Sequence, residues 1–155
     1  MLYALLKTVH LLAVVLWVGG MLFAHFFLRP ALVVLDPPQR LKLMREVLRR
    51  FFAAVLGASL VVLASGLWMV GRVARAAAQG GGSFAWPLDW IVMTALGVLM
   101  LAIFGLIRFV LYRRFVAALD AGDASSAGAA LARIRAWVGT NLAIGLGLIA
   151  LVLLV

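Results

Sequence analysis

The sequence predicts an all-α integral membrane protein: a bundle of four transmembrane helices in a single domain, 1–155. Two observations support this fold class. Of the 155 residues, 67% are hydrophobic and 12% are charged, whereas an average soluble domain is about half apolar and about a quarter charged. Four stretches, roughly 3–28, 51–71, 88–112 and 136–155, reach the length of about 20 apolar residues that a helix needs to cross a bilayer.

The basic residues predict the orientation of these helices. A net charge of +9 could indicate a nucleic-acid partner, but the 14 lysines and arginines form short clusters between apolar stretches, which is a topology signal. Eleven of them surround the first and third connections: Arg29, Arg40, Lys42, Arg45, Arg49, Arg50, Arg108, Arg113, Arg114, Arg133 and Arg135. The other side has Lys7, Arg72 and Arg75. We therefore expect both termini in the periplasm of a bacterial inner membrane, with the lipid bilayer and no nucleic acid as partner.

The ends of the helices have their own signals. The first stretch lacks a convincing cleavage pattern, so we expect a mature helix and not a signal peptide. Asp36 before Pro37 is a favourable N-cap, and no breaker follows before the second span. Asp123 begins the same arrangement before the fourth span, so both spans should continue helices that start in the cytoplasm. Segment 76–87, AAAQGGGSFAWP, predicts a flexible periplasmic loop that ends at Pro87.

Segments 29–36 and 113–120, RPALVVLD and RRFVAALD, align with arginine first and Leu-Asp last. Further along the same alignment, Arg49 falls on Arg133. This suggests two parallel two-helix repeats, related by an axis along the membrane normal. Chance similarity between two charged connections is the alternative.

The two histidines of the chain, His10 and His25, lie on one stripe of the first helix, together with Val14, Trp17, Met21 and Ala24. Their separation of 15 residues is about 22 Å along a helix, so they cannot bind the same metal ion or haem iron within one chain. Ionisable groups inside a membrane are costly, which favours a ligand role for His10. A neutral imidazole bonded across helices is the alternative for both.

Two features of the sequence suggest what this stripe could bind. Gly19 and Gly20 leave part of the helix without side chains, which permits either close helix packing or the approach of a flat cofactor. Near the depth of His10 we expect Met69 and Met93, and a histidine with two thioethers suits Cu(I); core filling is the alternative role of the methionines.

Other polar residues are expected at the same two depths. Lys7 and Asp89 could form an ion pair near His10. The neighbours expected around His25 form a hydrogen-bonded mouth on the cytoplasmic side: Arg108, Tyr112, Thr140 and Asn141.

The pattern KTVHLLAVVLWVGGMLFAHFFLRPAL, followed by PPQR, RRFF, SGLWM and, at 126–142, SAGAALARIRAWVGTNL, resembles the CopD family, the copper resistance D-type membrane domain. It is similar to short members that consist of this four-helix domain alone. The resemblance implies copper binding, uptake or tolerance at the inner membrane. It also suggests a periplasmic copper carrier as a partner.

A more distant similarity is to the HemJ-type protoporphyrinogen oxidases, whose Lys, His, Trp, Gly spacing is matched by Lys7, His10, Trp17 and Gly20. That similarity implies a b-type haem with His10 as an axial ligand. Relatives of both kinds often have histidine at the start of the third helix, where this chain reads WPLDWIVMTALG. Three alternatives are then open: Met93 substitutes for the missing histidine, a second copy of the chain supplies His10, or the site is lost.

Three functions therefore remain open: a copper-associated membrane protein, a haem-binding redox protein, and a non-catalytic subunit of a larger complex. Enzymatic activity is the less favoured interpretation. The serines at 59, 65, 83, 125 and 126 have no histidine base expected at matching depth, and QGGGSF lacks the lysine of a phosphate-binding loop.

Overall fold

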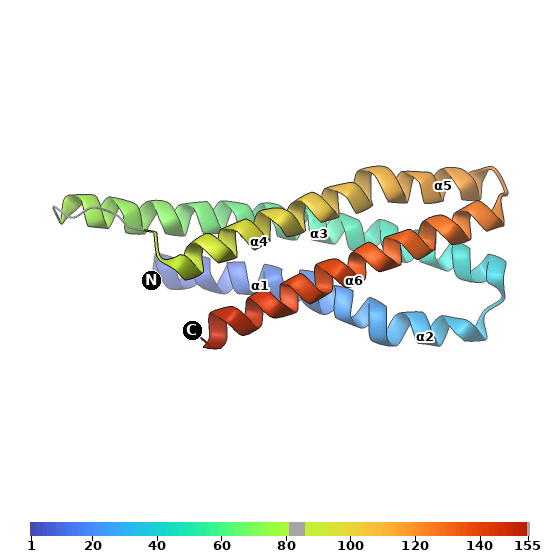
Figure 1. Cartoon of the computed structure of the whole chain (residues 1–155), viewed down its shortest axis with the longest axis horizontal. Coiled ribbons are helices and arrows are strands. Elements are labelled where there is room, and N and C mark those ends of the chain that lie inside the picture. The colour runs from blue at the N-terminus through green and yellow to red at the C-terminus, as the bar shows by residue number, and fades with distance from the viewer. Residues whose placement is uncertain (81–85, 155) are drawn as a thin grey trace.

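The computed structural model describes residues 1–80 and 86–154 and confirms the all-α fold class. Four long helical segments run through the molecule, and each is long and apolar enough to cross a membrane (Figure 1). No strand occurs in the part of the chain that the structure describes. The predicted periplasmic loop falls partly on residues 81–85, which lie outside the described residues.

The first segment is helical throughout but irregular near its end. It consists of α1 (Leu2–Phe23), the π-helix η1 (Ala24–Leu28), α2 (Arg29–Ala31) and the 3-10 helix η2 (Leu32–Val34). Pro30 accounts for the change, because proline has no N–H to donate to the carbonyl four residues earlier and its ring crowds that carbonyl. The first helical segment ends at Val34, six residues beyond the predicted span of 3–28.

The second segment, α3 (Pro37–Gln79), is one uninterrupted helix of 43 residues, as the capping signals predicted. Asp36 occupies the N-cap position, but its side chain makes no capping hydrogen bond. Pro38 removes the N–H of the second helical residue, one of the two groups that an N-cap side chain accepts from; the Gln39 N–H remains, but no capping bond to it is formed.

The third and fourth segments form a tight hairpin. The third consists of α4 (Leu88–Gly105), the π-helix η3 (Leu106–Leu111) and α5 (Tyr112–Asp120), and the fourth is α6 (Ala124–Leu154). Gly122 adopts φ +72°. Its N–H donates to the Leu119 carbonyl and the N–H of Asp123 donates to the Ala118 carbonyl; this pair of bonds is a Schellman motif. Asp123 then caps α6, as predicted, by accepting the Ser126 N–H at 2.9 Å.

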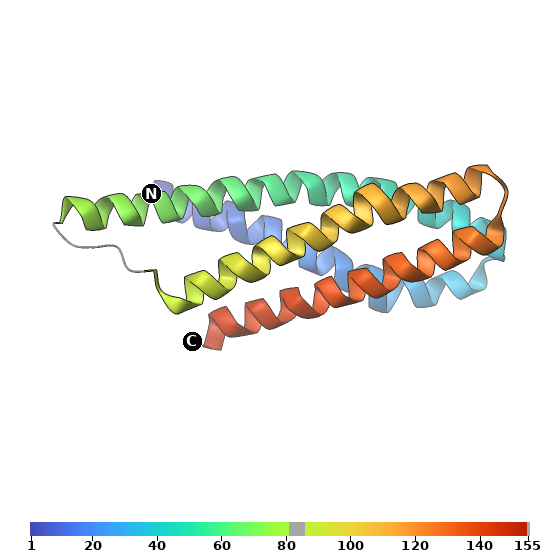
Figure 2. The same ribbon diagram turned by 45° about the horizontal axis from the view of Figure 1, so that its top comes forward.

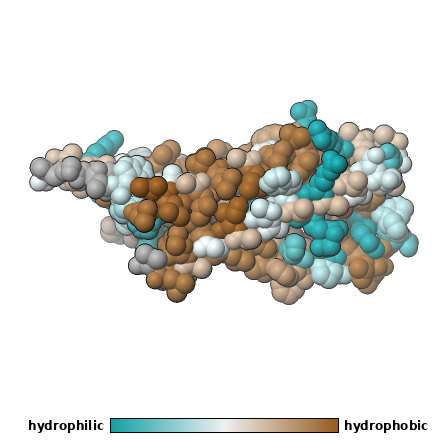
Figure 3. Space-filling model, in the orientation of Figure 1, coloured by the Kyte–Doolittle hydropathy of each residue, from teal (hydrophilic) through white to brown (hydrophobic). Residues whose placement is uncertain are grey.

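Both hairpins turn at the same end of the bundle, and the two termini lie toward the other end (Figures 1 and 2). α1 packs against α3, while α4 and α5 pack against α6. Aromatic rings join the two pairs: Phe52 of α3 meets Phe104 at 6.0 Å and Tyr112 at 5.4 Å between centroids. The space-filling view has an apolar surface over the middle and hydrophilic side chains gathered toward the end with the hairpin turns (Figure 3).

The repeat hypothesis remains a prediction, with one observation on each side. The two π-helices overlap when the sequence alignment is applied to them, since both lie just before the aligned arginines Arg29 and Arg113. The aligned aspartates differ, however: Asp36 is an N-cap, whereas Asp120 ends α5 and the equivalent cap is Asp123, three residues later.

Candidate metal and cofactor site

His10 lies against α3 in the half of the bundle that contains the termini. Its Nδ1 is 2.9 Å from the Oγ of Ser65, and Ser65 is buried, with 4% of its surface exposed. Gly66 is next to the same imidazole, since a methyl group added there would lie 3.7 Å from Cε1. The stripe predicted on the first helix therefore does face the bundle interior, with Trp17 and Met21 buried further along it.

The hydrogen-bond partners of Ser65 favour a proton on Nδ1 of His10. The Ser65 hydroxyl also contacts the Val61 carbonyl at 2.5 Å and the Val62 carbonyl at 3.2 Å. A carbonyl only accepts, and the hydroxyl has a single proton, so that proton goes to the backbone of α3. The hydroxyl oxygen must then accept from His10 Nδ1–H. In a neutral imidazole this leaves the lone pair on Nε2 free to bind a ligand.

This contact corrects the prediction that no histidine lies at the depth of the serines. The predicted depth placed His10 beside Met69, whereas the structure places it beside Ser65, four residues earlier and about 6 Å along the helix. The pair is not a hydrolytic nucleophile and base, because the hydroxyl proton is directed to the backbone and not to the imidazole. Ser65 was missed because the predicted depth of α3 relative to α1 was wrong by about one helical turn.

The two predicted thioether ligands lie on different helices. Met69 is one turn beyond Ser65 on α3, on the same side of the helix, and is half-buried. Met93 is on α4, which meets α1 through Trp17 and Phe104 in the middle of the bundle. Among the described residues, no three His, Asp or Glu side chains gather as a metal site would require, so further ligands would have to be thioethers or come from elsewhere.

The space expected for a flat cofactor is filled by protein. A methyl group at Gly20 would overlap the Phe51 ring of α3, reaching Cζ at 3.1 Å, with Cε2 closer still. Trp17, 5% exposed, packs edge-to-face on Phe104 at 5.9 Å. Gly19 meets nothing within 4 Å. The structure thus favours close helix packing, one of the two roles expected for Gly20.

His25 lies in η1 and faces α6. A methyl group at Gly139 would be 3.5 Å from its Cε1, and Phe26 meets its ring edge-to-face at 5.0 Å. Two of its predicted partners bond elsewhere: Tyr112 donates to the Arg45 carbonyl and Thr140 to the Ala136 carbonyl. His25 is therefore near the predicted part of α6, but without the expected hydrogen-bonded mouth.

Two further polar predictions can be compared with the structure. Lys7 and Asp89 are not paired: within residues 1–80 and 86–154, the ion pairs join Arg45 to Asp120 and Glu46 to its neighbours Arg49 and Arg50. Asn141 is 1% exposed, and its Oδ1 has no hydrogen-bond partner among the described residues.

Comparison with known proteins identifies a family. A family model described as Copper resistance protein D matches residues 45–155. The matched range contains Ser65, Met69 and Met93, and begins after both histidines. No curated protein and no solved structure matches the chain.

Proposed function

We propose that the chain, which belongs to the copper resistance protein D family and has four helices long and apolar enough to cross a membrane, binds copper within the bundle through His10. In this proposal copper is a transported or bound ion, and the chain contributes to copper uptake or copper tolerance. No catalytic step is assigned to the chain.

The observation that carries the proposal is the hydrogen bond between His10 and Ser65. It favours the Nδ1–H tautomer and holds the ring, and Nε2 would then be the ligand atom. A histidine ligand whose other nitrogen donates to a protein oxygen is the usual arrangement at metal sites. The neighbouring Met69, one turn along the same helix, would supply a soft thioether suited to Cu(I). Met93 would join only as a third ligand from α4.

The proposed orientation places this site on the periplasmic side. The hydrophilic end with the hairpin turns carries the basic connections, and the positive-inside rule assigns that end to the cytoplasm. Both termini and His10 would then face the periplasm of a bacterial inner membrane, where a periplasmic copper carrier could deliver the ion. A haem function gains no support, because Phe51 occupies the space beside Gly20.

The test is a Cu(I) titration of the whole chain purified in mild detergent, with an absorbance spectrum of every sample. We expect His10→Ala to weaken binding at least tenfold and Met69→Leu to weaken it less, while His25→Ala, the matched histidine at the other end, binds like the wild type. Equal binding by His10→Ala and wild type would refute the site. A Soret band lost in His10→Ala would instead assign the histidine to haem.

Ser65 provides a sharper version of the same titration. Loss of a group that orients a metal-binding histidine typically costs about 10- to 100-fold in affinity, so Ser65→Ala should weaken Cu(I) binding although the serine touches no metal. Ser65→Thr keeps the hydroxyl and should restore most of the affinity. If Ser65→Ala binds normally, the imidazole is not oriented by this hydrogen bond.

A further inference from the structure

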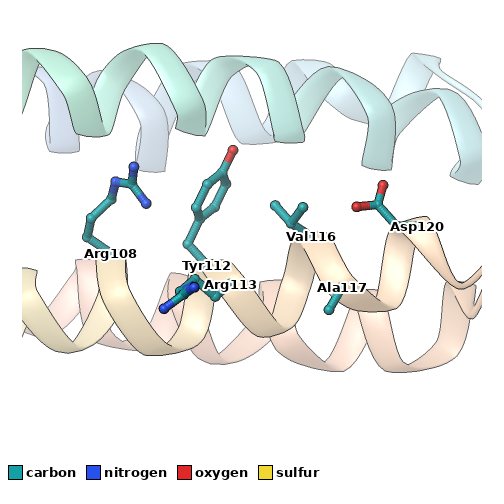
Figure 4. A pocket seen from close by; sticks show the side chains of 6 residues that line it. All are labelled: Arg108, Tyr112, Arg113, Val116, Ala117 and Asp120. Atoms are coloured by element: carbon teal, nitrogen blue, oxygen red, sulfur yellow. The ribbon is translucent and has the colours of Figure 1, made fainter.

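An open cleft of about 270 Å³ lies along the third segment, at the end of the bundle with the hairpin turns (Figure 4). It is lined by Arg108, Tyr112, Arg113, Val116, Ala117 and Asp120. Arg108, Tyr112 and Asp120 point toward α3 in this view, and Arg113 points away from it. Its lining thus includes two arginines and one carboxylate.

The carboxylate does not neutralise the arginines of the cleft. Asp120 is bound by Arg45 of α3, with Nη1 and Oδ1 2.6 Å apart. The buried Tyr112 donates its hydroxyl to the Arg45 carbonyl at 3.1 Å. These two contacts tie α5 to α3 and leave the cleft with the net positive charge of Arg108 and Arg113.

Arg108 is held in position without a counter-ion. Its guanidinium carbon lies 5.4 Å from the centre of the Tyr112 ring and 5.7 Å from that of Phe109, distances at which cation–π attraction operates. Neither Arg108 nor Arg113 forms an ion pair within the described part of the chain. Stacking on rings leaves the planar N–H donors free, and their fork geometry matches a phosphate group.

We propose that this cleft binds an anionic phosphate group, with Arg108 as the principal contact and Arg113 as the second. The position of Arg108 favours a phospholipid headgroup as its source. The residue belongs to η3, at the end of the apolar part of the third segment, and basic pockets between transmembrane helices near the cytoplasmic surface bind anionic headgroups. A free phosphate anion has the same chemistry and is the second source. The proposal is independent of copper binding.

The experiment is native mass spectrometry of the delipidated whole chain in mild detergent, titrated with phosphatidylglycerol and, in parallel, with zwitterionic phosphatidylcholine. Wild type should bind phosphatidylglycerol at least tenfold more tightly than phosphatidylcholine. Arg108→Gln should remove most of this preference and Arg113→Gln part of it. Arg135→Gln, an exposed arginine at the same end outside the cleft, is the matched control and should change it less than threefold.

A second arm separates the two sources. If the cleft binds a lipid headgroup, inorganic phosphate at millimolar concentration should leave phosphatidylglycerol bound. If the cleft binds a free anion, inorganic phosphate should displace phosphatidylglycerol in an Arg108-dependent manner. Both results support the phosphate site. Equal losses in Arg108→Gln and Arg135→Gln, or no preference for the anionic lipid in the wild type, would overturn it. If circular dichroism shows that Arg108→Gln fails to fold, Arg113→Gln takes its place in the comparison with Arg135→Gln.

Discussion

Adjacent glycines of the first helix provide a matched pair of substitutions that tests how α1 packs against α3. Gly20 faces Phe51, and a methyl group there would overlap the ring. Gly19 meets nothing within 4 Å of its added methyl group. Gly20→Ala should therefore destabilise the protein relative to Gly19→Ala, although the two changes are chemically identical and one residue apart.

The magnitude follows from what each methyl group meets. Both substitutions gain the same helix propensity, up to about 1 kcal/mol, and this gain cancels in the comparison. Overpacking against a ring costs typically about 1–3 kcal/mol. We thus expect Gly20→Ala to be less stable than Gly19→Ala by about 1–3 kcal/mol, because the half-buried Phe51 has to move.

The assay is unfolding of the purified chain in mixed detergent micelles, followed by circular dichroism. Shortening the ring in Gly20→Ala/Phe51→Leu should recover most of the loss, while Phe51→Leu alone should not stabilise. Equal stabilities of the two alanine variants would refute the packing of Phe51 on Gly20 and would reopen the space beside Trp17 for a flat cofactor.

Two further predictions concern α6. The hydrogen bonds from the Ser126 side chain and N–H lower the pKa of the Asp123 carboxyl, so its stabilisation is present above its unfolded pKa of about 3.9 and is lost as pH falls through the lower folded value. Asp123→Ala should thus melt below wild type at pH 7, with a gap that closes below about pH 4; a constant gap would contradict this. Asn141→Leu removes a buried, unpaired oxygen and should stabilise by about 1–3 kcal/mol; a thermal melt below wild type would show that the amide has a partner.

Much of the fold could be predicted from the sequence, because membrane helices depend on hydrophobic length and caps, which are local signals. The cap at Asp123 and the start of α3 well before its apolar stretch are examples. The π-helices could not be predicted: η1 has Pro30 nearby and η3 follows Gly105, but neither residue type specifies a π turn. Asp36 has the right position, but Pro38 removes one of the two N–H groups that it could accept from, and the structure has no capping bond from its side chain.

The candidate site was predicted less well, because it depends on the relative depth of two helices. His10 was recognised from its own helix, since an ionisable residue stands out within an apolar stretch. Which residue of α3 lies beside His10 depends on the axial offset between α1 and α3. The predicted offset was wrong by one helical turn, so Met69 was expected where Ser65 lies. Trp17 and Gly20 were placed on the correct face, but the Phe51 ring that fills that face comes from another helix.

The unbroken length of α3 also has a mechanical consequence. At 43 residues it is about 64 Å long, roughly twice the thickness of the hydrocarbon core of a bilayer. Ser65 and Arg45, which binds Asp120, therefore lie on one continuous helix, so tilting one end of α3 displaces the other end. The first segment is interrupted by a π turn, a 3-10 turn and the extended Leu35, and this segment absorbs bending. We therefore expect relative movement of the two helices to be concentrated between residues 24 and 35, away from His10.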